Sequence, residues 1–561
     1  MPGFEEAVSF IKEYIQNNSK NATLIKKLCE NDYIYNVTIM ELIEEYIKIG
    51  RYIQSGDSTK IGEELYEKYK HIEKTILDNL RDEILNIYDK LKLVKFETKN
   101  LIKGLNGSFV EPGLSGMPCD DLENILPTGR NFYLMDYEKI PTKEAYKIGC
   151  KLANGIIEKY IEEEGTIPEK IAMNMISTDI SMAKGEQLSQ MLYLMGITHV
   201  WDQSGKVVDL EAIPLEKLKR PRIDVIVRIS GVLRDAYPNV INLMDKGTVI
   251  ASSLEEPFES NFVRKNTFEI ARVLKELGEN EDIERRSTMR VFGDKPGTYG
   301  SGVNLALMAS AWKDEKDIGK IFVYFSSHAY GENLNGRMAK HEFVENIKAS
   351  EISYDTTISN RYDVLSSGFA ASVQGGFRAV KKLLSGKEMK QYHGGTENKD
   401  NIRICTLKEE IKKTMEETFF NPLWKENVKK NGYTGASEFM RRIQSVFDWQ
   451  CLSKNIDNKD IDKLVDLYVN DEEMVKWFSE HNKYAVEEIG RRFLELYERK
   501  KWNPDKEILD KLRKNYIKIE GDMEELSENS KGEIQGGDIE ILNYEDIESW
   551  SDKLKDVDDI F

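Results

Sequence analysis

Hydrophobic positions in the first hundred residues recur at the spacing of an amphipathic helix. Apolar pairs return every three or four positions in residues 10–15 and 42–47, which places each set on one side of a helix. Between residues 72 and 105 the same spacing predicts two helices with a break near Val94. We therefore expect a helical layer over residues 1–105.

From residue 142 onward, short apolar runs alternate with helical segments. Helices are predicted at residues 143–163, 185–195 and 303–309, and strands at residues 171–176, 198–201, 223–229, 289–292 and 321–325. Strands separated by helices of ~10–20 residues are typical of a mostly parallel sheet with helices on both faces. The predicted fold class is thus α/β, with a helical N-terminal layer, a mostly parallel α/β core and a helical C-terminal region.

Changes in composition along the chain suggest domain boundaries. The 561 residues suffice for about three or four domains. We expect a helical region at 1–105, an α/β core with Gly-rich loops at 106–345, a mainly helical domain at 346–518 and an acidic tail at 519–561. No run approaches the ~18 apolar residues of a membrane span, and the acidic N-terminus lacks the pattern of a secretory signal, so a cytoplasmic protein is expected.

The charge of the chain is concentrated at its end. Residues 520–561 hold 15 acidic residues and three lysines, a net charge of −12 out of −18 for the whole chain. The remainder is nearly balanced and lacks the excess of basic residues typical of nucleic-acid binding, so no nucleic-acid partner is expected. The five cysteines form no CxxC pair and the six histidines no HExxH pair, which makes a preformed zinc site an unfavoured interpretation.

The stretch from Met289 to Gly302 joins a predicted strand to a predicted helix through a glycine-rich turn. Gly297 and Gly300 lie in this turn, next to Tyr299. A strand, a glycine-rich turn and a helix in succession present backbone N–H groups that bind anions, although such a turn is also a common tight connection. The turn ends in no Gly-Lys-Ser/Thr sequence and lacks dinucleotide-binding spacing, so we expect this chain not to bind ATP itself.

Charged residues cluster at the predicted carboxyl ends of these strands, where α/β sheets bind ligands. Arg234 and Asp235 follow the strand at residues 223–229, and His328 follows the predicted strand at 321–325. Arg228 lies inside an apolar strand, so it must either pair with a carboxylate or face a cleft. For Arg228 a structural ion pair is the alternative to an anion site, and for His328 the alternative is a structural role.

A second candidate region lies in residues 106–136, which are rich in Gly, Pro and Asn. A loop of this length in a compact domain is usually functional or disordered, and its apolar residues favour order. Glu111, Arg130 and Asn131 are its candidate polar groups.

Several motifs together resemble one family. They include FVEPGLSG at residues 109–116, LPTGRNFY at 126–133, RPRIDVIVRISGVLRD at 220–235, RVFGDKPGTYGSG at 290–302, NPLW at 421–424 and NGYTGASEF at 431–439. In this order they resemble the cobaltochelatase large subunit (CobN) and the related H subunit of magnesium chelatase. The motifs FVEPGLSG and LPTGRNFY resemble the cobalt branch more than the magnesium branch. The resemblance runs from about residue 80 to the end and corresponds to the C-terminal half of such a subunit.

This resemblance implies a subunit that binds a tetrapyrrole and takes part in inserting a divalent metal, cobalt or magnesium, as substrate; the cobalt reaction belongs to cobalamin biosynthesis. ATP is then hydrolysed by separate AAA+ and integrin-I-domain partner subunits, and a separate chain with the missing N-terminal half is a further expected partner. By position, Glu111, Asp235 and His328 are the candidates for proton removal and metal delivery. No metal ligands are assigned. The predicted substrate-binding residues are Arg130, Asn131, Arg228, Arg234, Arg290, Gly297, Tyr299 and Gly300.

Two departures from the family pattern support an alternative. An upstream histidine-rich segment is absent, and Tyr362 and Ser366 stand where the family tends to have a histidine and an aspartate. The alternative is a non-catalytic tetrapyrrole-binding or scaffold protein that assembles with the AAA+ subunits. A third hypothesis assigns the recruitment of the ATPase to the acidic tail.

Overall fold

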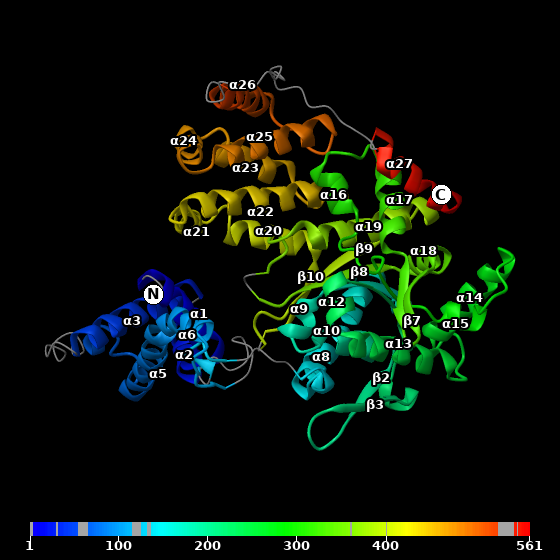
Figure 1. The fold of residues 1–561 in the computed structure, drawn as a ribbon, viewed down its shortest axis with the longest axis horizontal. Helices are drawn as coiled ribbons and strands as arrows, with labels where there is room; N and C mark the ends of the chain where they lie inside the picture. The colour runs from blue at the N-terminus through cyan, green and yellow to red at the C-terminus, as the bar shows by residue number, and fades with distance from the viewer. Residues whose placement is uncertain are drawn as a thin grey trace. The chain divides into compact units, whose positions relative to one another are not determined.

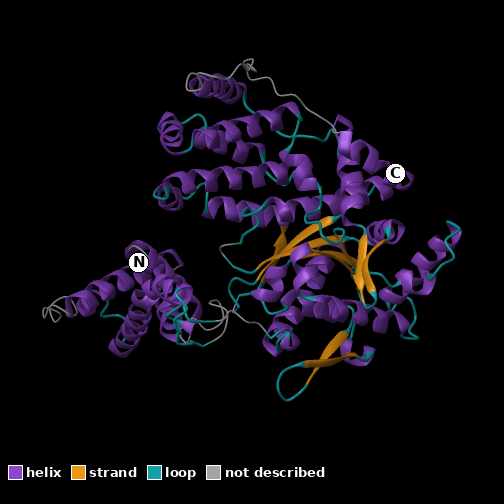
Figure 2. Ribbon diagram, viewed as in Figure 1, coloured by secondary structure: helices purple, strands orange, loops and turns teal. Residues whose placement is uncertain are grey.

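The computed structural model describes residues 4–29, 32–53, 65–114, 125–131, 136–359, 362–399, 401–524, 544–546 and 548–561. The chain forms two compact units, residues 1–136 and 137–561. The first unit is helical, and the second combines helices with one large sheet (Figures 1 and 2). No described helix is long and apolar enough to cross a membrane.

The first unit is a small helical bundle. Its helices are α1 (Phe4–Asn18), α2 (Lys20–Leu28), α3 (Asp32–Ile53), α5 (Lys74–Lys92) and α6 (Phe96–Leu105). Ile11, Leu42 and Leu80 are fully buried in its core, as their helical spacing predicts. The predicted break near Val94 is the short 3-10 turn η1 (Leu93–Lys95) between α5 and α6.

An eight-stranded sheet lies at the centre of the second unit, in the order β10-β9-β8-β1-β4-β5-β6-β7. Its strands are β1 (Lys170–Met175), β4 (Asp224–Ile229), β5 (Val291–Gly293), β6 (His328–Gly331), β7 (Leu334–Met338), β8 (Ile352–Thr357), β9 (Lys390–Gly395) and β10 (Arg403–Thr406). The five strands from β9 to β5 are parallel, whereas the pairs β10–β9, β5–β6 and β6–β7 are antiparallel. The predicted mostly parallel α/β fold is confirmed. A separate two-stranded ribbon pairs β2 (Ile197–Trp201) with β3 (Val207–Ala212).

Helices cover both faces of this sheet (Figure 1). One face packs against α8 (Lys143–Glu164), α10 (Glu186–Leu194) and α13 (Pro238–Ser253), and the other against α17 (Glu315–Ser326), α19 (Gly368–Ser385) and α20 (Leu407–Glu417). The shorter helices are η2 (Tyr137–Lys139), α9 (Ser177–Ser181), α11 (Leu215–Leu218), α12 (Gly231–Ala236), α15 (Ile283–Ser287), α16 (Val303–Met308) and α18 (Lys340–Ala349), and α14 (Phe262–Glu276) packs beside α13.

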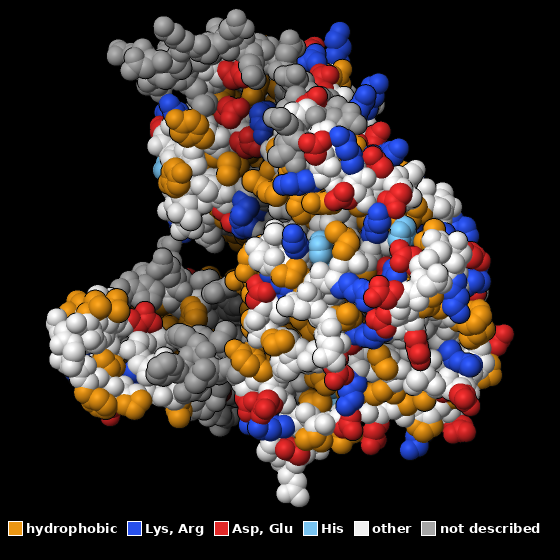
Figure 3. All heavy atoms as spheres, turned by 45° about the vertical axis from the view of Figure 1, so that its right-hand side comes forward, with side chains coloured by type: hydrophobic (Ala, Val, Ile, Leu, Met, Phe, Trp, Pro, Cys, Tyr) orange, Lys and Arg blue, Asp and Glu red, His pale blue; other side chains and the backbone are white. Residues whose placement is uncertain are grey.

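Further helices stack on α19 and share its core. They are α21 (Pro422–Lys429), α22 (Gly432–Ser453), α23 (Asn458–Tyr468), α24 (Glu472–His481), α25 (Lys483–Glu498) and α26 (Lys506–Glu524). The C-terminal residues fold back as η3 (Tyr544–Asp546), α27 (Glu548–Leu554) and η4 (Lys555–Ile560). Lys340 of α18 pairs with Asp559 at 2.7 Å, and Val557 is fully buried. Over the face turned forward in Figure 3, acidic and basic side chains are interspersed.

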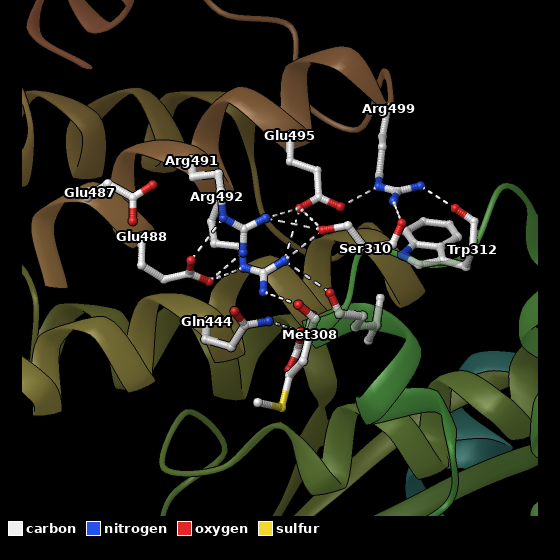
Figure 4. A network of polar contacts seen from close by, with 12 residues as sticks. Met308, Ser310, Trp312, Gln444, Glu487, Glu488, Arg491, Arg492, Glu495 and Arg499 are labelled. Carbon is white, nitrogen blue, oxygen red and sulfur yellow. Dashed lines mark hydrogen bonds and ion pairs between the residues drawn. The ribbon is translucent and has the colours of Figure 1, made fainter. Parts of the chain in front are cut away.

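A polar network joins α25 to the segment that follows α16 (Figure 4). The Arg492 guanidinium donates to the carbonyl of Met308 at 2.8 Å, and Arg499 donates to the carbonyl of Ser310 at 2.8 Å. Glu495, which is fully buried, accepts from both arginines and from the Ser310 hydroxyl. The helical stack therefore holds the segment after α16 in place.

One prediction of secondary structure fails. Residues 321–325 form the second half of α17 instead of a strand: the Asp314 side chain caps the helix by accepting from the backbone of Lys316 and Asp317, and a short apolar run does not distinguish a buried helix from a strand. The sheet also includes β8, β9 and β10 from residues 352–406, which are strands that the sequence analysis did not predict. The domain boundaries at residues 105, 345 and 518 stay predictions.

Asp448 provides a test of how burial affects stability. It lies in α22 with 3% of its surface exposed, and burial raises its pKa to about 7, although Gln444 donates a hydrogen bond and Arg492 is near; Glu495 adds to the rise. Because the folded protein holds this proton to about pH 7 and the unfolded chain releases it near pH 4, the contribution to stability is present below about pH 4 and lost as the pH rises to 7.

Replacing Asp448 with asparagine keeps the shape of the side chain and removes this loss. The variant is expected to gain stability relative to wild type by about 1.4 kcal/mol per pH unit between about pH 5 and pH 7. Urea unfolding at several pH values measures the difference, and Asp209→Asn, at an exposed site, is the control. Identical pH slopes for wild type and Asp448→Asn would show that the buried carboxyl does not titrate in this range.

Candidate functional site

The glycine-rich loop at residues 293–302 joins β5 to α16, at the carboxyl edge of the parallel strands. Gly297, Gly300 and Gly302 all have positive φ angles, of 79°, 99° and 77°. A Cβ atom at Gly302 would lie 2.3 Å from the Phe325 ring of α17. Glycine is therefore required at Gly302 by both backbone conformation and space.

Arg234 of α12 organises this loop. Its Nη1 donates to the carbonyls of Asp294, Lys295 and Thr298 at 3.0–3.1 Å. The same guanidinium pairs with the Asp235 carboxylate at 2.7 Å and with the Asp294 carboxylate at 3.2 Å. Because one planar side chain joins three loop carbonyls and two carboxylates, it fixes the loop as a unit.

Arg228 lies beneath this cluster in β4. It is fully buried, and its Nη2 donates to Asp294 Oδ1 at 2.7 Å. The guanidinium carbon lies 5.1 Å from the centre of the Phe369 ring. Arg228 thus forms the structural ion pair that was one of its two expected roles. Its Nε and Nη1 atoms form no hydrogen bond with the described residues.

Asp235 and His328 differ in protonation. The hydrogen bond from Arg234 is the main cause that lowers the pKa of Asp235, and Tyr299 Oη also donates to it at 2.8 Å, so Asp235 is ionised at neutral pH. His328 begins β6 opposite Gly293 and has 7% of its surface exposed. Burial, with smaller effects of Lys295 and Arg234, lowers the pKa of His328, which leaves a neutral imidazole at pH 7.

The structure gathers seven of the predicted site residues at this edge of the sheet. They are Arg228, Arg234, Asp235, Gly297, Tyr299, Gly300 and His328. The sequence analysis missed Asp294, which joins Arg228 to Arg234, and Tyr330, whose hydroxyl donates to the Asp294 carbonyl. A lone aspartate after a strand gives no local signal, because its partners are distant in sequence.

Arg290 lies elsewhere, and its expected position with the loop is corrected. It precedes β5 and therefore lies at the amino end of the strand, where its Nε donates to Asp224 Oδ1 at 2.9 Å. Its Nη1 donates to the carbonyls of Ser287 and Met289, and Asp224 also pairs with the buried Lys170. The guanidinium is used within the fold, so Arg290 is not part of the candidate site.

The three remaining predicted residues belong to the first unit. Asn131 Nδ2 donates to the carbonyls of Leu114 and Ile125 at 2.7 and 2.9 Å, and the Arg130 carbonyl accepts from Gly113 at 2.6 Å. These bonds bring two of the quoted motifs together. Glu111 is exposed. Its convergence with Asp235 and His328 of the second unit stays a prediction.

The fold is that of an α/β protein in which arginines and a glycine-rich loop form a cluster at the carboxyl edge of a parallel sheet. A family model described as CobN/Magnesium Chelatase matches residues 5–509, and the chain belongs to this family. Within the described residues, no group of three or more His, Cys, Asp or Glu side chains forms a metal cluster.

Relatives from several organisms agree with this assignment. The chain is 39% identical to an uncharacterized protein of Methanocaldococcus jannaschii (86% of this chain and 38% of that one). It is 31% identical to the aerobic cobaltochelatase subunit CobN of Pseudomonas aeruginosa (72% and 33%) and 32% identical to the magnesium-chelatase subunit ChlH of Oryza sativa subsp. indica (83% and 34%).

A solved structure shows the same architecture. The catalytic subunit of cobaltochelatase from Mycobacterium tuberculosis superimposes with a TM-score of 0.78 and 28% identity, over 91% of this chain and 42% of that one. The chain thus spans between about a third and about two fifths of the length of these relatives and of this structure.

Proposed function

We propose that this chain is the C-terminal half of a cobaltochelatase-type subunit that binds a tetrapyrrole for ATP-dependent insertion of a divalent metal, cobalt, in cobalamin biosynthesis. The observation that carries the proposal is the cluster of Arg228, Arg234 and Asp294 that shapes the glycine-rich loop. The family and its cobaltochelatase members support the choice of cobalt.

The surface beside this cluster suits a flat macrocycle with acidic substituents. Tyr299, Val232, Leu305 and Met308 are large apolar side chains that are 47–64% exposed on or next to the loop. Apolar and aromatic surfaces bind the faces of ring systems, and a few placed polar groups fix their orientation. Lys295 and the backbone N–H groups of the loop are the groups that would bind carboxylates at the rim.

The roles of the charged residues follow from their partners. All three guanidinium nitrogens of Arg234 are engaged within the fold, so it positions the loop instead of contacting the ligand. His328 is neutral and has an Nδ1 atom without a partner in the described part of the chain. A neutral imidazole has a lone pair for a proton, and we assign to His328 the removal of pyrrole N–H protons as the metal enters.

The proposal includes partners that this chain does not contain. AAA+ and integrin-I-domain subunits would hydrolyse ATP, a separate chain would supply the N-terminal half, and the reaction would take place in the cytoplasm. The second candidate function, a non-catalytic tetrapyrrole-binding scaffold, is favoured by Tyr362 and Ser366, which depart from the family pattern. Binding without metal insertion in the assembled complex would favour the scaffold.

Titration of the full chain with tetrapyrroles tests the proposed function. We expect saturable fluorescence quenching by hydrogenobyrinic acid diamide, with weaker binding of protoporphyrin IX, because the former has more carboxylate and amide groups at its rim. Arg272→Ala, which removes an exposed arginine from α14, is the matched control and should bind like wild type. Absence of binding to both macrocycles would contradict the proposal.

A further inference from the structure

Four neighbouring parallel strands place polar side chains in one row across the sheet. The register pairs Arg228 with Asn174 between β4 and β1, and Asp355 with His393 between β8 and β9. Asn174 Nδ2 donates to Asp355 Oδ2 at 2.8 Å and joins the two pairs. All four residues are at most 5% exposed. A buried row of this kind needs an explanation, since sheet interiors are normally apolar.

The row lies at the same carboxyl edge as the glycine-rich loop. Side chains alternate between the two faces of a strand, so Asn174 shares a face with Ala172, and Arg228 shares it with Ile226. Ala172 and Ile226 belong to the core formed with α19, and the Arg228 guanidinium contacts Phe369 of that helix. Arg228 therefore links the row to Asp294 and to the candidate tetrapyrrole site.

Besides the Nε and Nη1 atoms of Arg228, two atoms of the row that could bind a metal ion lack partners among the described residues. His393 Nε2 is hydrogen-bonded to Thr357 Oγ1 at 2.8 Å, and no described residue is bonded to its Nδ1. Asn174 Oδ1 is likewise buried without a partner in the described part of the chain. In the tautomer that donates the Nε2 proton to Thr357, Nδ1 carries a free lone pair. An unpaired buried polar atom costs about 1–3 kcal/mol, so two in one place indicate a missing ligand.

We propose that Asp355, His393 and Asn174 form a weak binding site for the divalent metal substrate, from which the ion passes to the tetrapyrrole. A carboxylate oxygen, an imidazole nitrogen and an amide oxygen are donors that first-row divalent ions accept. Neighbouring strands lie about 4.8 Å apart, so side chains at one register reach a common ion at about 2.0–2.2 Å. The inference rests on the proposed function for the identity of the acceptor.

The charges of the row favour a cation held weakly over an anion. Asp355 is buried and accepts a hydrogen bond from the neutral amide of Asn174, a contact that does not neutralise the charge of its carboxylate. Arg228, the next residue in the row, is itself a cation, and its charge lowers the affinity for a metal ion. Asp355 and His393 are the only acidic or histidine ligands among the three proposed residues, so the bound ion would keep open coordination positions. A delivery site must release its ion, and weak, open coordination allows release.

The transfer is an exchange of ligands without a redox change. The ion gives up its bonds to Asp355, His393 and Asn174 and forms bonds to the ring nitrogens. Each ring N–H that the metal displaces gives its proton to a base, for which His328 at the same edge of the sheet is placed.

Titration of the metal-free full chain with Co²⁺, followed by calorimetry and visible absorption, tests the site. Asp355→Asn and His393→Gln keep the size of each side chain and remove a donor, and each is expected to weaken Co²⁺ binding about tenfold or more. Asp209→Asn and His341→Gln are matched controls on exposed or half-exposed side chains and should leave the affinity unchanged.

A third variant distinguishes the loss of a metal ligand from a loss of Co²⁺ affinity caused by misfolding. Asn174→Asp adds a carboxylate to the row and is expected to raise the Co²⁺ affinity about tenfold, a gain that a damaged fold would not produce. Affinities equal to wild type in all three row variants would overturn the site.

The tetrapyrrole titration on the same preparations separates the two proposals. Normal tetrapyrrole binding together with variant-insensitive Co²⁺ binding would reject the metal site and leave the proposed function intact. Variant-sensitive Co²⁺ binding without tetrapyrrole binding would support the metal site and reject the proposed function.

Discussion

Replacement of Glu495 with alanine is expected to destabilise the second unit by about 3–5 kcal/mol. Glu495 is fully buried and lies at 2.9 Å from Arg492 and 2.7 Å from Arg499, which are 3% and 2% exposed (Figure 4). Removing the carboxylate leaves the buried Arg499 guanidinium without its counter-ion and leaves Arg492 with Glu488 alone, which costs more than the pair itself contributes. Urea unfolding measures the loss, with fluorescence of Trp312, whose ring lies 4.1 Å from the Arg499 guanidinium carbon, as a local probe.

Glu498→Ala is the matched control from the same helix. Its carboxylate pairs with Arg513 at 3.3 Å, and both side chains are more than 40% exposed. Exposed pairs contribute about 0–1 kcal/mol, so this variant should unfold nearly like wild type. A loss in Glu495→Ala no larger than in Glu498→Ala would show that the network does not hold the segment after α16.

Replacement of Arg234 with alanine is expected to weaken tetrapyrrole binding about hundredfold, which corresponds to about 2.7 kcal/mol. The guanidinium donates to three carbonyls of the loop and pairs with Asp235 and Asp294. Without the Arg234 side chain, the loop becomes ordered only when the ligand binds. The entropy lost in that ordering lowers the affinity for the tetrapyrrole. Fluorescence titration with hydrogenobyrinic acid diamide measures the change.

Arg234→Lys makes the test more specific. Lysine keeps the charge but lacks the planar fork that reaches several acceptors at once, so an intermediate loss of about tenfold is expected. Arg272→Ala should bind like wild type. Unchanged binding in Arg234→Ala would place the ligand away from the loop.

The sequence predicted the central strands because most of their side chains on both faces are apolar. β1 and β4 are fully buried, and each has four apolar residues and two polar ones. β8 and β9 were not predicted, because Ser353, Asp355 and His393 place polar residues on one face and interrupt the apolar run. Residues 321–325 were misassigned as a strand, since the apolar run is too short to show the helical spacing that α17 obeys.

The sequence predicted those residues of the candidate site that come directly after a strand. Arg234, Asp235 and the glycine-rich loop come after strands, and the parallel sheet brings their carboxyl ends to one edge. Arg290 precedes its strand, so the same rule places it at the opposite end. The role of Asp294 depends on Arg228 and Arg234, each at least 60 residues away in sequence, and the row from Arg228 to His393 depends on strand order. Such long-range pairing is absent from local patterns.

Hydrogen–deuterium exchange of the full chain, with and without saturating hydrogenobyrinic acid diamide, tests the central claim most directly. We expect slower exchange of residues 230–236 and 293–302, because a bound macrocycle would order the loop and α12, and unchanged exchange in β7 (Leu334–Met338). Saturable binding with no protection of either segment would contradict a tetrapyrrole site at the carboxyl edge of the sheet.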